Sequence, residues 1–158
     1  MSVYEIYLVK ESVAYDFFGK EHKLFNLFLE NQYEDSTLAA ILQKQVTYIT
    51  CSLSEQLLIT YILSRTSGAR QHTSEPNVIT YYDTASKGAT RLTVCPDRVL
   101  LESEGCFSGE MSFFESLRSF HGYFFASDYE SSRFGWLKPL RLKNTLHPTE
   151  PVATSQLI

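Results

Sequence analysis

Residues 4–30, YEIYLVKESVAYDFFGKEHKLFNLFLE, contain both of the periodicities that decide the fold. Tyr4, Ile6 and Leu8 alternate with other residues, and a repeat of two is typical of a β-strand. Apolar residues then recur at helical spacing, at positions 13, 17, 24 and 28 and in a second row at 14, 18, 25 and 29. The stretch therefore predicts a strand followed by one long helix, which Ser12 caps with its hydroxyl.

The predicted helix has more apolar surface than packing on a sheet requires. Gly19 lies inside it, at a cost of about 1 kcal/mol relative to alanine. The helix is rich in aromatic residues, and its first turns carry apolar residues on more than one side. Because a helix on a sheet buries one face, we expect another helix or a partner protein to cover the remainder.

Composition places the chain among cytoplasmic single-domain proteins. It has 158 residues, of which 44% are hydrophobic, enough for one sizeable core. A net charge of -4 argues against direct binding to nucleic acid, which depends on lysine and arginine at the phosphates. No signal peptide and no apolar run of membrane-spanning length is present, and three scattered cysteines are typical of reduced thiols.

Two further helices are predicted before residue 68. The second begins at a cap on Asp35 or Ser36, and one row of its residues is expected to face inward: Leu38, Ile41, Leu42, Gln45, Val46 and Ile49. Gln45 is the one amide in that apolar row. A capping box at 52–55 precedes the third helix, with Leu57, Leu58, Tyr61 and Ile62 inward, and residues 66–77 are predicted to be a polar connection.

The second half of the chain predicts an antiparallel meander with one helix. Strands are expected at 78–82, 91–94 and 99–101, since their connections are too short for parallel crossovers. A loop at 105–109, a short helix at 110–120, a buried strand at 123–126 and an aromatic loop at 133–139 follow.

The fold class that these elements predict is α+β. We expect one domain over residues 1–143, with a mixed, mainly antiparallel sheet of about five strands and helices packed on it. Residues 144–158 are polar with two prolines, and the sequence predicts a flexible tail there.

No catalytic constellation emerges from the residues. The four histidines are isolated, and none has a second histidine or a cysteine at metal-ligand spacing, so we expect neither a metal nor a cofactor. The run Gly105–Gly109 resembles a nucleophile elbow but has an extra residue before its serine. One alternative stays open, which is a small hydrolase or transferase whose cysteine or serine meets a distant histidine in the fold.

Four blocks of sequence resemble the sporulation inhibitor of replication family, SirA. They are YLVKESVAYDFFGKE at 7–21, the following KLFNLFLE, KQVTYIT at 44–50 and FFASDYESSRFGWLKP at 124–139. The resemblance implies a small cytosolic protein of an endospore-forming bacterium, without catalysis. It also implies a partner, the N-terminal domain of the replication initiator DnaA, whose binding blocks a new round of chromosome replication.

The same resemblance implies which residues touch that partner. Val13, Phe17 and Gln45 occupy the positions of the family's contact residues, and Lys44 and Lys20 lie near them in the sequence. Gln45 matches the family glutamine, Phe17 replaces a typical tyrosine, and Val13 stands where a phenylalanine is expected. A self-associating protein that uses the same apolar surface as a two-fold contact is a further alternative.

Overall fold

A computed structural model describes residues 1–33 and 37–141 of the chain, which form five α-helices and one seven-stranded sheet. The predicted caps Asp35 and Ser36 and the predicted tail at 144–158 lie outside these residues. The elements in chain order are β1 (Ser2–Leu8), α1 (Glu11–Asp16), α2 (Glu21–Tyr33), α3 (Leu38–Ile49), α4 (Glu55–Arg65), β2 (Ala69–Gln71), β3 (Val78–Asp83), β4 (Gly88–Val94), β5 (Val99–Glu104), α5 (Phe107–Phe120), β6 (Phe124–Asp128) and β7 (Arg133–Trp136).

The sheet has the order β2-β3-β4-β5-β1-β6-β7, and each neighbouring pair is antiparallel. The N-terminal strand β1 therefore lies inside the sheet, with Tyr4 opposite Leu101 of β5 and Tyr7 opposite Phe125 of β6. The predicted α+β class is confirmed, and so is the antiparallel meander at β3, β4 and β5. The sheet has seven strands instead of about five.

Two predicted loops contain the additional strands. The polar connection at 66–77 includes β2, which pairs with β3. The aromatic loop at 133–139 includes β7, in which Trp136 lies opposite Phe125. The polar composition of β2 did not indicate a strand, because an edge strand is half exposed to solvent. The aromatic residues of β7 were predicted to form a loop, although such residues suit the pleated, half-buried surface that this strand occupies.

The single helix predicted after β1 is wrong, because the chain breaks between α1 and α2 at Gly19. The φ angle of Gly19 is 79°, in the left-handed region that glycine adopts at low cost. Its N–H donates to Glu21 Oε1 at 3.1 Å, at the start of α2. Ser12 is also not the cap, since Lys10 precedes α1.

The later helices follow the prediction more closely. Helix α4 begins at Glu55 after Ser54, so the capping box at 52–55 is not formed, and Leu57 is 65% exposed instead of inward. Helix α5 begins at Phe107, earlier than predicted, and buries Phe113, Phe114 and Leu117 as expected.

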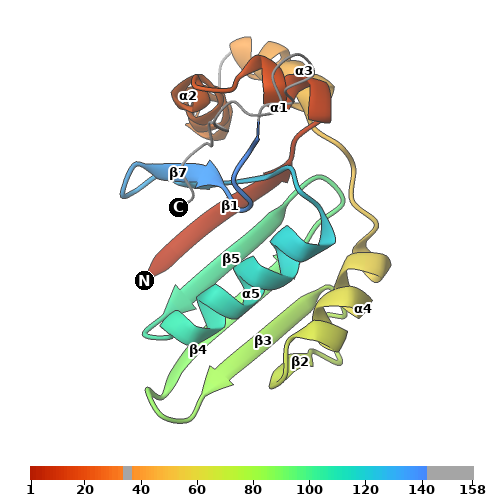
Figure 1. Cartoon of the computed structure of the whole chain (residues 1–158), viewed down its shortest axis with the longest axis vertical. Coiled ribbons are helices and arrows are strands. Elements are labelled where there is room, and N and C mark those ends of the chain that lie inside the picture. Colours follow the sequence, from red (N-terminus) through yellow and green to blue (C-terminus); the bar gives the residue numbers. More distant parts are fainter. Residues whose placement is uncertain (34–36, 142–158) are drawn as a thin grey trace, which may run out of the picture.

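Helices cover both faces of the sheet. Tyr4, Ile6 and Leu8 of β1 join one core cluster with α4 and α5, while Tyr7 joins a second cluster with α1, α2 and α3. Figure 1 shows α5 lying along β4 and β5, α4 beside β2 and β3, and the three N-terminal helices gathered at the end of β1. The alternation of β1 thus sorts its side chains between two hydrophobic cores.

Within the described ranges, no helix combines the length and the apolar character needed to cross a membrane.

Candidate functional site

The ends of β1 and α3 are fastened to each other by backbone hydrogen bonds. The Lys10 N–H donates to the Ile49 carbonyl at 2.9 Å, and the Cys51 N–H donates to the Leu8 carbonyl at 2.7 Å. Val9 and Thr50 form an isolated antiparallel bridge between the same segments. These contacts fix α3 beside α1, which begins directly after Lys10.

Aromatic packing holds α2 on the sheet. The Phe28 ring stacks on Tyr7 of β1 with 4.5 Å between the ring centres, and the Phe25 ring stacks on Phe134 of β7 at 4.7 Å. Such ring pairs stabilise a core by about 1 kcal/mol beyond their buried area. Helix α2 is thereby a rigid support against which α3 packs.

An open hollow lies where α1, α2 and α3 meet. Its volume is about 530 Å³, and its lining is mainly apolar: Phe17, Leu27, Ile41, Lys44, Gln45, Tyr48 and Ile49. Phe17 follows the last residue of α1, where the break at Gly19 turns the chain back toward α2. We call this feature the Phe17 hollow.

The Phe17 hollow brings together three of the five residues predicted to contact a partner. Phe17 is half-buried in its wall, and Gln45 and Lys44 of α3 are exposed at its edge. Val13 is half-buried against the core cluster beneath, and Lys20 is exposed; neither of them lines the hollow.

Helix α3 also exposes apolar residues that the sequence pattern had placed inside. Leu38 is 54% exposed and Ile41 is 53% exposed, whereas Val46 and Ile49 are buried as predicted. Tyr48, which the prediction did not single out, is 74% exposed. The sequence did carry a signal of this, since the apolar positions of α3 form two adjacent rows, more than one buried face requires.

A second open hollow adjoins the first. It has a volume of about 600 Å³ and lies between α2 and α3, lined by Leu29, Glu30, Tyr33, Leu38, Ile41, Leu42 and Gln45. Tyr33, at the end of α2, is 71% exposed. Because both hollows share Ile41 and Gln45, they form one continuous surface, which we call the α3 surface.

A buried polar network lies behind this region, on the same face of the sheet. The Glu5 carboxylate is 5% exposed and accepts hydrogen bonds from Arg98 Nη1 at 2.9 Å and from the Tyr129 hydroxyl at 2.6 Å. Arg98 also donates to the Tyr7 hydroxyl at 3.2 Å. Burial, together with the nearby Glu5 charge, raises the pKa of Tyr7 and of Tyr129. Each of these side chains has a hydrogen-bond partner, so we interpret the network as structural.

The residues that resemble a nucleophile elbow do not form a catalytic arrangement. The Ser108 hydroxyl donates to Asp83 Oδ2 at 3.0 Å, and the backbone N–H of Ala85 and further hydrogen bonds hold the pKa of Asp83 below its usual range. A carboxylate with a lowered pKa is a weak base. The neighbouring Cys106 thiol is buried.

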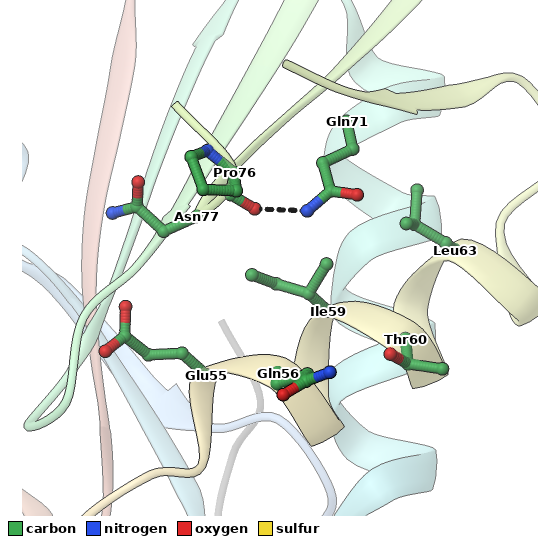
Figure 2. A pocket seen from close by; sticks show the side chains of 8 residues that line it. All are labelled: Glu55, Gln56, Ile59, Thr60, Leu63, Gln71, Pro76 and Asn77. Carbon is green, nitrogen blue, oxygen red and sulfur yellow. Dashed lines mark hydrogen bonds between the residues drawn. The ribbon is translucent and has the colours of Figure 1, made fainter. Parts of the chain in front are cut away.

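Another hollow, of about 460 Å³, lies between α4 and the segment that joins β2 to β3. Figure 2 shows the Ile59 side chain directed into it from α4, opposite Gln71, whose Nε2 donates to the Pro76 carbonyl at 2.5 Å. No cysteine or histidine is among the residues that line it. In residues 1–33 and 37–141, no group of three His, Cys, Asp or Glu side chains is placed to hold a metal ion.

The chain is similar to known proteins over most of its length. A family model described as sporulation inhibitor of replication protein SirA matches residues 2–141. The sporulation inhibitor of replication protein SirA of Bacillus subtilis (strain 168) is 30% identical over 151 residues, which cover 89% of this chain and 96% of that protein. The match includes the residues that build the Phe17 hollow.

Proposed function

We propose that this chain, which belongs to the sporulation inhibitor of replication (SirA) family, inhibits DNA replication at sporulation by binding the N-terminal domain of DnaA through the Phe17 hollow. Family membership supports the inhibitory role in replication. The observation that supports the surface is an open, mainly apolar hollow that contains both Phe17 and Gln45.

Phe17 acts as the apolar anchor of the complex. A half-buried ring in a hollow wall is already ordered by its neighbours, so its burial under a partner has a small entropic cost. Interfaces concentrate their binding energy in a few such side chains, and truncating the strongest costs at least about 2 kcal/mol.

Gln45 fixes the orientation of the partner. Its amide has a donor and an acceptor, and it is exposed at the junction of two apolar hollows, where docking removes water. An amide left without partners after that loss of water costs about 1–3 kcal/mol, so the partner surface must offer matching groups. Inhibition follows if the DnaA domain needs the covered surface for self-assembly or for helper proteins.

Titration calorimetry with the isolated N-terminal domain of the cognate DnaA tests the proposal. Phe17→Ala and Gln45→Ala are each expected to weaken binding by tenfold or more. Phe107→Ala and Gln56→Ala are matched controls, because both residues are exposed and line neither of the two hollows along α3. Unchanged affinity of the first two variants, with their circular dichroism intact, rejects this surface.

A further inference from the structure

Three segments distant in sequence meet around a further open hollow, with a volume of about 690 Å³. They are α1, the turn that joins α5 to β6, and the segment that follows β7. The aromatic and basic residues that line it are Tyr15, Phe120, His121, Tyr123, Lys138 and Arg141. We call it the Tyr123 hollow. It shares no residue with the two hollows along α3, and its volume lies in the range of small-molecule sites, about 300–1,000 Å³.

The charge of the Tyr123 hollow is opposite to that of the chain as a whole. The chain has 18 acidic and 14 basic side chains, yet Lys138 and Arg141 line the hollow and no aspartate or glutamate does. Both cations are exposed, and within the described part of the chain neither forms a salt bridge. Two cations on one rim without carboxylate partners attract a ligand that carries negative charge.

Aromatic rings form much of the remaining wall. The Tyr15 ring of α1 lies edge-on to the Tyr123 ring with 6.1 Å between their centres, and the centre of the His121 ring lies 5.5 Å from that of Tyr123. The Tyr123 carbonyl accepts a hydrogen bond from the Val9 N–H at 2.9 Å, which fastens this wall to the end of β1. Tyr15 and Tyr123 are half-buried, so each is held in place and still presents apolar surface on which a flat ring stacks.

The polar groups of these rings are placed to donate hydrogen bonds. The Tyr123 N–H donates to His121 Nδ1 at 3.2 Å, so the proton of the neutral imidazole is on Nε2. Burial, the Tyr15 hydroxyl and the Glu11 carboxylate raise the pKa of Tyr123, so its hydroxyl carries no charge at neutral pH. Glu11 and the C-terminal end of α5 are negative features nearby, and the helix end amounts to about half a charge. The two full positive charges on the rim exceed their sum.

We propose that the Tyr123 hollow binds a nucleoside phosphate, with its base stacked on the Tyr15 and Tyr123 rings and its phosphates held by Lys138 and Arg141. A simple anion leaves the rings uncovered, and an apolar ligand leaves the cations without a counter-charge. A ligand that joins a flat ring to a negative group satisfies both. The inference is independent of the proposed function, because it uses no residue of either hollow along α3.

The two cations have different tasks in this site. The Arg141 guanidinium matches a phosphate with two parallel N–H donors, whereas the Lys138 ammonium acts as a point charge. A Cβ atom on Gly122 would lie 3.9 Å from Lys138 Cδ, so the lysine stem lies beside the turn that holds His121 and Tyr123. The ammonium is thereby kept near the rings, at a position where one ligand reaches both.

Calorimetric titration of the full chain with each of the four ribonucleoside triphosphates tests the proposal. At least one is expected to bind, with a Kd about tenfold or more below those of its own nucleoside and of inorganic triphosphate. No binding of any of the four up to about 5 mM overturns the inference. Equal affinity for inorganic triphosphate means an anion site without base recognition, equal affinity for the nucleoside means that the cations contribute nothing, and either result overturns it.

Substitution of the cations locates the phosphates. Lys138→Ala and Arg141→Ala are each expected to raise the Kd for the triphosphate about fivefold and to leave that for the nucleoside within about twofold. Lys23→Ala and Arg70→Ala are matched controls, because both residues are exposed and line none of the hollows described. Binding that survives both rim variants unchanged overturns the assignment of this site.

Substitution of a ring locates the base. Tyr15→Leu is expected to raise the Kd for triphosphate and nucleoside alike about fivefold, and Tyr15→Phe, which keeps the ring, should restore binding. Tyr82→Leu is the control, since Tyr82 is 66% exposed on β3. Should Tyr15→Leu lose its circular dichroism signal, the two rim variants still decide the question.

Nuclear magnetic resonance of the chain places the bound nucleotide directly. Its addition should shift the backbone amide resonances of Gly122 and Tyr123, and shifts confined to other parts of the chain overturn the inference. A single-stranded oligonucleotide that binds at least about tenfold more tightly than its mononucleotide assigns the hollow to nucleic acid, which also overturns it. None of these outcomes affects the binding of the DnaA domain by Phe17 and Gln45, so the two proposals fail separately.

Discussion

The Lys10 ammonium lies 4.8 Å from the centre of the Tyr48 ring, at the point where the turn after β1 meets the end of α3. The backbone N–H of Lys10 also donates to the Ile49 carbonyl. Together these contacts fasten the helix that carries Gln45 to the segment that leads to Phe17. The geometry of the Phe17 hollow is therefore set by contacts between residues distant in sequence.

The salt dependence of binding should change when Lys44 is removed. Lys44 is exposed at the edge of the Phe17 hollow, where a charge steers association more than it contributes to affinity. Lys44→Ala is expected to lower the association rate several-fold at low ionic strength and to have little effect at about 0.5 M salt, because screening is then nearly complete. Stopped-flow measurements check this, with Lys138→Ala, which lies outside both hollows, as the control. Equal losses at low and high salt would contradict a steering role.

Gly19 should be required both for stability and for the position of Phe17. An alanine at Gly19 meets nothing within 4 Å, so the penalty comes from its φ of 79° alone. A side chain in the left-handed region costs about 1–2 kcal/mol. Urea denaturation of Gly19→Ala should show that loss, and Gly19→Asn should lose less, because asparagine tolerates this region. Identical stability of the glycine and alanine chains would mean that the break forms without left-handed backbone.

Gly88 should tolerate no side chain, because β4 approaches the end of β5 closely there. A Cβ atom at Gly88 would lie 2.3 Å from the Gly105 carbonyl oxygen, which belongs to the backbone and has little room to move. Gly88→Ala is expected to destabilise the fold by at least about 2 kcal/mol. Gly122→Ala is the control, since its nearest contact is Lys138 at 3.9 Å. Thermal unfolding compares the two, and a similar melting temperature for both variants would refute this close approach.

Alkaline pH should destabilise the protein through its buried tyrosines. The pKa of Tyr4 rises to about 12, mainly through burial, and the pKa of Tyr7 and of Tyr129 rises for the same reason. Above pH 10 the unfolded chain releases these protons while the folded chain keeps them, so the contribution of these tyrosines to stability is constant below that pH and falls above it. Each such tyrosine lowers the free energy of unfolding by about 1.4 kcal/mol per pH unit in this window.

Tyr129→Phe separates one tyrosine from the others. The variant loses the hydrogen bond to Glu5, so it should be about 1–2 kcal/mol less stable at neutral pH. The free energy of unfolding of this variant should also fall less steeply with pH above pH 10, because phenylalanine has no proton to release. Urea denaturation between pH 7 and pH 11 checks both effects. If the free energy of unfolding of the variant falls with pH as steeply as that of the wild type, Tyr129 does not contribute to the pH dependence.

Much of the fold was predictable from local patterns. The alternation at Tyr4, Ile6 and Leu8 predicts a strand, and the structure places these side chains in one core and Tyr7 in the other. Short connections predict the antiparallel meander, since they cannot span a parallel crossover. The errors at β2, β7 and Gly19 share a cause: single-sequence patterns do not reveal edge pairing or the φ angle of one residue.

The shape of the candidate site was not predictable from the sequence. The family resemblance implied Phe17 and Gln45 as partner contacts, while the patterns alone indicated an aromatic-rich helix and one amide in an apolar row. Leu38 and Ile41 have the same periodicity as Val46, so the pattern placed all of them inside. Only the packing of α3 against α2 decides which of the two adjacent rows is buried.

Local patterns specified most of the element types and the antiparallel meander of β3, β4 and β5, and identities at fixed positions indicated the family. These follow from interactions between residues close in the chain, or from identities at fixed positions. Long-range packing decides that β1 lies inside the sheet, that the chain breaks at Gly19 and that Leu38, Ile41 and Tyr48 of α3 stay exposed. Those outcomes depend on which surfaces compete for burial between segments far apart in sequence, and local periodicity carries no information about that competition.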